Sequence, residues 1–192
     1  MQERASAATK AGGSGTGVVM TIQVGDRVPE ATLTESVEFG PACPVGPTPL
    51  TTTAALQGKK VVIFGVPGAF TPTCSAKHVP GYVEHLPELK AKGVDEVWCV
   101  ATNDGFVMAA WGKELQAIGK VRFLGDGSAD FAKKLGLGMP ICHDGPDGLA
   151  KQLDLKQIPF TLVLDRSGDV VFTTGSSDDA ALAALDAATR QA

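Results

Sequence analysis

The chain has 192 residues, of which 44% are hydrophobic and 20% are charged, so it predicts one globular domain that can bury a sizeable core. Its formal net charge of −4 argues against nucleic acid as the main partner. No apolar run approaches the roughly 18 residues that a membrane-spanning helix needs, so we expect no membrane partner either.

The N-terminal segment differs in composition from the rest of the chain. Its first 19 residues are rich in Ala, Gly, Ser and Thr without a hydrophobic period, and residues 11–17 read as a flexible linker. We therefore expect a flexible extension over 1–19 and one folded domain over 20–192. There is no secretory apolar segment, which favours a cytoplasmic protein and leaves organellar targeting open.

The four cysteines, Cys43, Cys74, Cys99 and Cys142, form no Cys-x-x-Cys pair and no cluster with zinc-ligand spacing. We expect neither a metal site nor another cofactor. Four cysteines in a domain of this length do not suggest a disulfide framework. The pattern predicts a reducing compartment in which at least one thiol is kept for chemistry.

The first third of the domain predicts strands separated by loops. Residues 24–33 alternate and contain Pro29, which predicts an edge strand. Residues 40–49 hold four prolines and two glycines and predict a loop. Residues 50–56 predict a strand end followed by a helical turn. The continuous apolar run 61–66 is typical of a buried parallel strand.

A helix is predicted from Cys74, because apolar residues follow it at helical spacing. Pro80 and Pro87 interrupt that spacing, so we expect a kink near the start of the helix. The next strand is predicted over 94–101. Cys99 lies within it, where it reads as a small buried hydrophobic residue.

Asp104 is placed to cap a second amphipathic helix, which Gly119 should end. A short strand over 121–124 and a short helix within 126–137 follow. Residues 144–155 nearly repeat 126–137. A single echo is too few copies for a solenoid.

The C-terminal part predicts a β-hairpin from residues 160–165 and 169–173, followed by a last helix whose start carries Ser176 and Asp179 as a loose capping box. Strands and helices mostly alternate along the chain. The order predicts an α/β sandwich with a mixed central β-sheet flanked by helices.

The most informative feature is Cys74, which follows the predicted strand 61–66 and a tight loop and opens the next helix. A thiol in the first helical turn lies near unpaired backbone N–H groups and the positive end of the helix dipole. Both favour the thiolate, which is the nucleophilic form of cysteine. The position predicts a reactive cysteine.

The segment around Cys74 reads Phe-Gly-Val-Pro-Gly-Ala-Phe-Thr-Pro-Thr-Cys-Ser and carries the pattern Pro-x-x-x-Thr-x-x-Cys. It resembles the type-5, or atypical two-cysteine, branch of the peroxiredoxins over about residues 20–138. Further matching segments are 22–33, 77–82, 103–106, 111–112 and 119–122. The resemblance implies a thioredoxin-like fold and a thiol peroxidase that reduces hydrogen peroxide and alkyl hydroperoxides.

The resemblance also implies roles for three residues. Cys74 would attack the peroxide and become a sulfenic acid. The Thr71 hydroxyl would hydrogen-bond the thiolate and the peroxide, and Pro67 would shield the sulfur. His78, four residues after Cys74, reads either as a general base or as a packing or surface histidine.

The match breaks where the family carries an arginine close to the cysteine, because Ile158 and Pro159 stand at the corresponding place. Arg122 is a candidate to replace that cation; otherwise it is a solvated charge at a strand end. After residue 138 the chain resembles thioredoxin-like thiol oxidoreductases more closely, in which such a proline is cis and faces the active cysteine. Pro159 could equally be an ordinary proline at the entry to a strand.

The sequence does not decide which thiol returns oxidised Cys74 to its reduced form. Cys142 is the first candidate for a resolving cysteine and Cys43 the second, since position 79 is valine. The default interpretation is a one-cysteine cycle, with glutathione, glutaredoxin or thioredoxin as the external reductant. The resemblance implies a homodimer. Two other hypotheses are a thioredoxin-fold oxidoreductase or redox sensor with weak peroxidase activity, and a non-catalytic interaction module.

Overall fold

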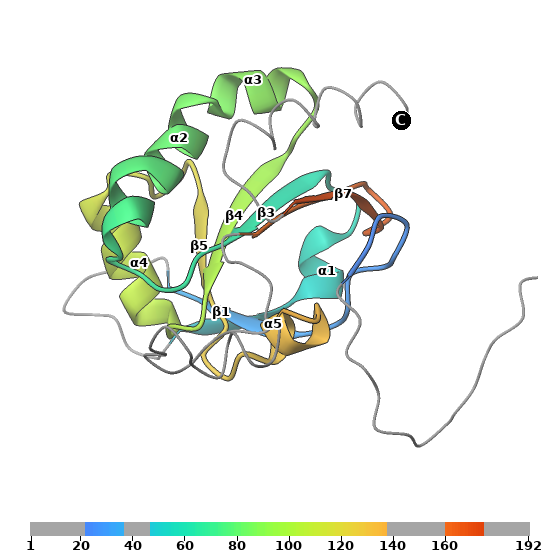
Figure 1. Cartoon of the computed structure of the whole chain (residues 1–192), viewed down its shortest axis with the longest axis horizontal. Coiled ribbons are helices and arrows are strands. Elements are labelled where there is room, and N and C mark those ends of the chain that lie inside the picture. The colour runs from blue at the N-terminus through green and yellow to red at the C-terminus, as the bar shows by residue number, and fades with distance from the viewer. Residues whose placement is uncertain (1–21, 37–46, 138–159, 175–192) are drawn as a thin grey trace, which may run out of the picture.

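The computed structural model describes residues 22–36, 47–137 and 160–174 (Figure 1). Its centre is a seven-stranded mixed sheet in the order β2-β1-β5-β4-β3-β6-β7. The strands are β1 Thr32–Glu35, β2 Thr48–Thr51, β3 Val61–Gly65, β4 Glu96–Ala101, β5 Arg122–Gly125, β6 Phe160–Leu164 and β7 Val170–Thr174. The helices are α1 Thr52–Leu56, a π-helical turn η1 Cys74–His78, α2 Val79–Glu84, α3 Leu86–Ala91, α4 Gly105–Glu114 and α5 Asp130–Lys134.

The predicted α/β sandwich is confirmed. Strands β3, β4 and β5 are parallel, and the remaining pairs are antiparallel. Every residue of β3 is buried, as its continuous apolar sequence predicted for a central strand. The predicted hairpin is β6 with β7, and the predicted strand end and helical turn are β2 and α1.

The prediction of an edge strand over 24–33 is wrong. Only its end lies in β1, and β1 is flanked by β2 and β5, so β2 forms the edge. Pro29 lacks an N–H group and cannot donate to a ladder. Its carbonyl instead accepts from the Thr52 hydroxyl at 2.9 Å, and the N–H of Ala31 donates to that same hydroxyl oxygen at 3.0 Å.

Two hydrophobic cores lie on opposite faces of the sheet. Helices α2, α3 and α4 cover one face, and α1 and α5 cover the other (Figure 1). The first core holds Phe64, Cys74, Cys99, Trp111 and Phe123 among its buried members. The second core lies under α1 and α5 and includes Leu56, Ile63, Trp98, Leu124 and Phe131.

The irregularity predicted from Pro80 and Pro87 is present. The helix begins with the π-helical turn η1, in which the N–H of Val79 bonds to the carbonyl of Cys74, five residues back. Pro80 has no N–H with which to continue an α-helical ladder across this turn. The segment breaks again at His85, and Pro87 stands in the first turn of α3.

Asp104 caps α4 as predicted, because its Oδ1 accepts the N–H groups of Phe106 at 2.8 Å and Val107 at 3.0 Å. The helix ends at Glu114, earlier than the predicted stop at Gly119. The helix predicted within 126–137 is α5, and Asp126, which precedes it, accepts the N–H groups of Phe131 and Ala132. Burial raises the pKa of the Asp126 carboxyl.

No described helix is long and apolar enough to cross a membrane. The N-terminal extension 1–19, the repeat 144–155 and the predicted last helix lie outside the described residues.

Candidate active site

Cys74 lies where the sequence predicted it, at the start of a helical segment that follows β3 and a short loop. The loop closes when the N–H of Ser75 donates to the Thr71 carbonyl at 2.9 Å. Cys74 is 4% exposed and belongs to the core beneath β3 and β4. The sulfur therefore lies at a helix start and within apolar surroundings.

His78 contacts the sulfur. Its Nδ1 lies 3.7 Å from Cys74 Sγ, and the imidazole is 7% exposed. Both residues belong to η1, at its first and last positions. The sequence analysis weighed His78 as a base or as a packing residue; in the structure it is buried and contacts Cys74 Sγ. Its i+4 spacing from Cys74 was the signal for this contact.

Thr71 and Pro67 lie in the loop before Cys74. The Thr71 hydroxyl donates to the Gly68 carbonyl at 2.8 Å, and no hydrogen bond joins it to Sγ among the described residues. Pro67 is exposed, whereas Val66 just before it is buried. The structure thus places both residues in the cysteine loop, without the contact to sulfur that was expected for the Thr71 hydroxyl.

Asn103 is a site residue whose contact the sequence analysis did not predict. Its Oδ1 accepts the backbone N–H of Ala69 at 2.8 Å, which ties the cysteine loop to the end of β4. Its position within a segment that matches the family, 103–106, was the available signal. Beside this contact, Trp111 on α4 donates its Nε1–H to Ser75 Oγ at 3.0 Å. Two tethers therefore hold the residues on either side of Cys74.

Tyr82 lies in the same hydrophobic core as Cys74. Its ring stacks on Phe64 with centroids 4.0 Å apart, and its hydroxyl lies 2.9 Å from Thr161 Oγ1 on β6. Both oxygens are buried. This contact fixes α2 against the sheet and positions the helical segment that carries Cys74.

Cys99 is buried, as predicted. It lies on β4 in the same core as Cys74. Burial, and next the negative charge of Cys74, raises the pKa of the Cys99 thiol well above its ordinary value. Cys99 is therefore held as an unreactive thiol.

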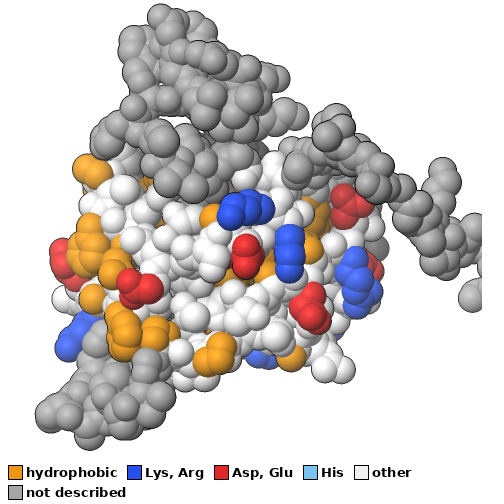
Figure 2. Space-filling model, turned by 90° about the horizontal axis from the view of Figure 1, so that it is seen from below, with side chains coloured by type: hydrophobic (Ala, Val, Ile, Leu, Met, Phe, Trp, Pro, Cys, Tyr) orange, Lys and Arg blue, Asp and Glu red, His pale blue; other side chains and the backbone are white. Residues whose placement is uncertain are grey.

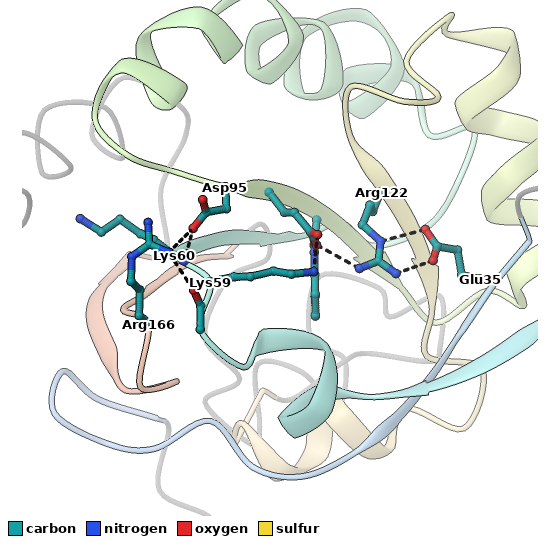
Figure 3. A network of polar contacts seen from close by, with 9 residues as sticks. Glu35, Lys59, Lys60, Asp95, Arg122 and Arg166 are labelled. Carbon is teal, nitrogen blue, oxygen red and sulfur yellow. Dashed lines mark hydrogen bonds and ion pairs between the residues drawn. The ribbon is translucent and has the colours of Figure 1, made fainter.

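Arg122 is not brought to Cys74. Its guanidinium binds both carboxylate oxygens of Glu35 and donates to Glu96 at 3.0 Å (Figure 3). It also lies over the Trp98 ring, 5.2 Å from the centroid. The Glu35 hydrogen bonds raise the pKa of Arg122 further above its usual value.

The register of the sheet explains this placement. Arg122 pairs with Trp98, and the next residue, Phe123, pairs with Cys99. Cys99 and Phe123 face the core that contains Cys74, whereas Trp98 faces the other core. Since side chains alternate along a strand, Arg122 points to the face away from the sulfur. The structure agrees better with the alternative interpretation of Arg122, a charge at the end of a strand, although this charge is paired with carboxylates rather than solvated.

The remaining candidates, Cys43, Cys142 and the Ile158–Pro159 pair, lie outside the described residues.

Comparisons with known proteins agree with this site. The sequence matches the Redoxin family over residues 23–188. It is 43% identical to Peroxiredoxin-2B of Arabidopsis thaliana over 163 residues, which cover 82% of this chain and 95% of that protein. The crystal structure of reduced Prx3 of Vibrio vulnificus in complex with H2O2 is similar, with 37% sequence identity, a TM-score of 0.70, and coverage of 86% of this chain and 99% of that chain. The crystal structure of peroxiredoxin 5 of Alvinella pompejana is also similar, with 28% sequence identity, a TM-score of 0.66, and coverage of 88% of this chain and 99% of that chain. A fold of this kind, carrying a cysteine in this loop and matching over nearly its whole length, makes the chain a member of the peroxiredoxins, the thiol peroxidases of the Redoxin family.

Proposed function

We propose that this peroxiredoxin reduces hydrogen peroxide and alkyl hydroperoxides through a sulfenic acid at Cys74, in the manner of the type-5 branch. The observation that carries the proposal is the placement of Cys74 at a helix start, between two residues, Ala69 and Ser75, that Asn103 and Trp111 hold by hydrogen bonds. A cysteine held in a fixed orientation can meet the peroxide oxygen without a further loss of conformational freedom.

The proposed reaction balances with two thiol equivalents. The Cys74 thiolate attacks the terminal peroxide oxygen, an S–O bond forms and the O–O bond breaks. The leaving oxygen takes up a proton and departs as water or alcohol, so the peroxide is reduced by two electrons. A thiol then attacks the sulfenic acid and releases water, and a second thiol resolves the disulfide and returns Cys74.

We infer that Thr71 and Pro67 act on the substrate. The Thr71 hydroxyl donates to the Gly68 carbonyl and keeps its lone pairs free to accept from a peroxide O–H. Pro67 is exposed at the entrance to the loop, where its ring limits access to the sulfur by size alone. Thr71→Val, which keeps the shape and removes the hydroxyl, should slow peroxide reduction without changing the fold.

The reductant is proposed to be glutathione, glutaredoxin or thioredoxin, acting in a cytoplasmic, reducing setting. Cys142 remains the first candidate for a resolving cysteine. An internal resolving step predicts a disulfide between Cys74 and Cys142 after one equivalent of peroxide, which Cys142→Ser abolishes. A one-cysteine cycle predicts a mixed disulfide with the external thiol instead.

We also propose a homodimer. Phe70 in the cysteine loop and Phe106 at the start of α4 are large apolar side chains that are 48% and 46% exposed. Figure 2 shows hydrophobic side chains gathered toward the edge on which α4 lies in Figure 1, while most basic side chains in view lie on the other half. Sedimentation of the wild type and of Phe106→Ser at several concentrations tests this association.

The deciding experiment adds one equivalent of hydrogen peroxide to the reduced protein and traps sulfenic acid with dimedone for mass spectrometry. Modification at Cys74, with oxidation much faster than that of a free thiol, is the expected result. Cys99→Ala is the matched control and should behave like the wild type. Oxidation of Cys74 no faster than a free thiol, together with rapid disulfide exchange with a protein thiol, would favour the oxidoreductase alternative. Function that survives Cys74→Ser would favour the interaction module.

A further inference from the structure

A buried imidazole touches the reactive sulfur. His78 Nδ1 lies 3.7 Å from Cys74 Sγ, within hydrogen-bond reach of a sulfur atom, and the two residues are 7% and 4% exposed. Their surroundings are apolar, with Val66 and Val79 packed in the same core. A polar contact at low dielectric is stronger than the same contact in water.

The chain builds this contact with an unusual backbone. Residues 74–78 form a π-helical turn, closed by the bond from Val79 N–H to the Cys74 carbonyl. Turns of this kind occur frequently at functional sites. The prolines at 72 and 80 bracket the turn and limit the alternatives open to its backbone. Cys74 and His78 are thus the two ends of one rigid unit.

The sheet keeps Arg122 away from Cys74. Arg122 is held by Glu35 and Glu96 on the face away from Cys74. Among the described residues, His78 supplies the nitrogen within hydrogen-bond distance of Sγ. The hydrophobic core that holds Cys74 also contains the titratable side chains of Tyr82 on α2 and Cys99 on β4.

We propose that His78 is a catalytic residue that takes up the Cys74 thiol proton at Nδ1 and then holds the thiolate through that N–H. The S–H bond breaks, its electron pair stays on sulfur, and the proton moves to the imidazole. The resulting charge on His78 stabilises the thiolate as a neighbouring cation would. When the peroxide O–O bond breaks, the leaving oxygen takes this proton, and the imidazole returns to its neutral state.

This proposal rests on the proposed function only in taking the Cys74 thiolate as the nucleophile. The two tests below therefore follow alkylation and titration, and peroxide reduction serves only to separate the two proposals. A chain that alkylates rapidly at Cys74 but reduces no peroxide would contradict the proposed function alone. A chain that reduces peroxide rapidly with His78 removed would contradict the role of His78 alone.

The first test measures alkylation of Cys74 by iodoacetamide against pH, with the modified residue identified by mass spectrometry. His78→Leu should move the pH midpoint of alkylation up by about one unit, which slows alkylation about ten-fold at pH values below both midpoints. His78→Asn places an amide nitrogen near the Nδ1 position, so it should lose less than His78→Leu. His85→Leu is the matched control, since His85 is half-exposed and pairs with Glu88.

The second test needs no change at His78. The sequence holds three histidines, so their ring signals can be assigned and titrated by NMR in the reduced protein and in Cys74→Ser. The midpoint of the His78 titration should be higher in the reduced wild type than in Cys74→Ser by at least one pH unit, while that of His85 stays the same. Equal His78 midpoints in the two proteins, or an unchanged alkylation profile in a folded His78→Leu, would overturn the proposal.

Discussion

The backbone N–H of Ala69 donates to Asn103 Oδ1 at 2.8 Å, so the loop that leads to Cys74 is tied to the residues that follow β4. Strands β3 and β4 are parallel, and their carboxyl ends therefore meet at the same edge of the sheet. Phe70 beside this bond has a φ of 61°, a conformation that a bulky residue adopts only when its surroundings impose it.

Replacing Asn103 should loosen the cysteine loop. Asn103→Ala removes the acceptor, and we expect about a five- to ten-fold loss in the rate of peroxide reduction, equivalent to about 1 kcal/mol for one hydrogen bond. Hydrogen exchange at the Ala69 amide should accelerate by a similar factor. Asn103→Asp keeps an acceptor oxygen and should keep that amide protected; equal exchange rates in the two variants would contradict the tether.

Gly125 should tolerate no side chain. A Cβ at this position would stand 2.5 Å from the Asn103 carbonyl oxygen and 2.7 Å from Asp104 C, both backbone atoms that cannot turn aside. We expect Gly125→Ala to lower the free energy of unfolding by about 1–3 kcal/mol, measured in urea. Gly127→Ala is the matched control, because its Cβ would lie 3.9 Å from the Asn103 oxygen. Equal stability of the two variants would show that the loop after β4 yields easily.

Arg122 should matter for stability and not for the reactivity of Cys74. Arg122→Met leaves Glu35 and Glu96 without their shared cation in a partly buried place, and we expect a loss of about 1–3 kcal/mol in the free energy of unfolding, discounted for the 30% exposure of the arginine. Alkylation of Cys74 should be unchanged. Arg166→Met, which removes the more exposed pair with Asp95, should change stability by less than about 1 kcal/mol. Slower alkylation in Arg122→Met would restore Arg122 as a partner of the sulfur.

Glu96 should contribute to acid unfolding. Burial raises the pKa of this carboxyl, but hydrogen bonds from Lys59, Trp98 and Arg122 outweigh that effect and lower it. The folded state therefore binds a proton less readily than the unfolded chain. This part of the stability is present above the pKa of the unfolded chain and is lost as pH falls through the lower value of the folded state. Glu96→Gln should be less stable at pH 7 and should show a flatter fall in unfolding free energy between about pH 5 and 3.

Asp126 should affect the pH dependence of stability in the opposite direction to Glu96 and serves as its control. Burial raises its pKa, so its contribution to the free energy of unfolding increases as pH falls and is lost as pH rises through the folded value. Asp126→Asn should therefore steepen the acid loss that Glu96→Gln flattens. The same slope in both variants would contradict the assignment.

Local patterns predicted much of this molecule. The unbroken apolar run of β3, the cap at Asp104 and the start of a helix at Cys74 depend on neighbours in sequence, and all three are present. The face of Arg122 could not be read in this way. It depends on which residue of β4 stands opposite, and that register is set by pairing between distant segments. The prediction of an edge strand over 24–33 was wrong for a similar reason, because the edge position depends on the pairing of β2 with β1.

The site could be predicted only in part, because some of its contacts also depend on pairing between distant segments. Cys74, Thr71 and Pro67 share one loop and are recognisable from its sequence. The contact of Asn103 with Ala69 joins residues 34 positions apart and appears only once β3 and β4 pair. The proximity of His78 to Cys74 was visible as a spacing, but only the buried π-helical turn shows that the ring faces the sulfur.

Cys74 is also part of the hydrophobic core beneath β3, with only 4% of its surface exposed. Oxygen added to its sulfur places a polar group among apolar neighbours, so oxidation and unfolding form one thermodynamic cycle. Whatever unfolding free energy the oxidised chain loses reappears as an increased driving force for returning the sulfur to the thiol. The packing around Cys74 is therefore a determinant of its reduction potential. A substitution deep in this core can change that potential without contacting the substrate.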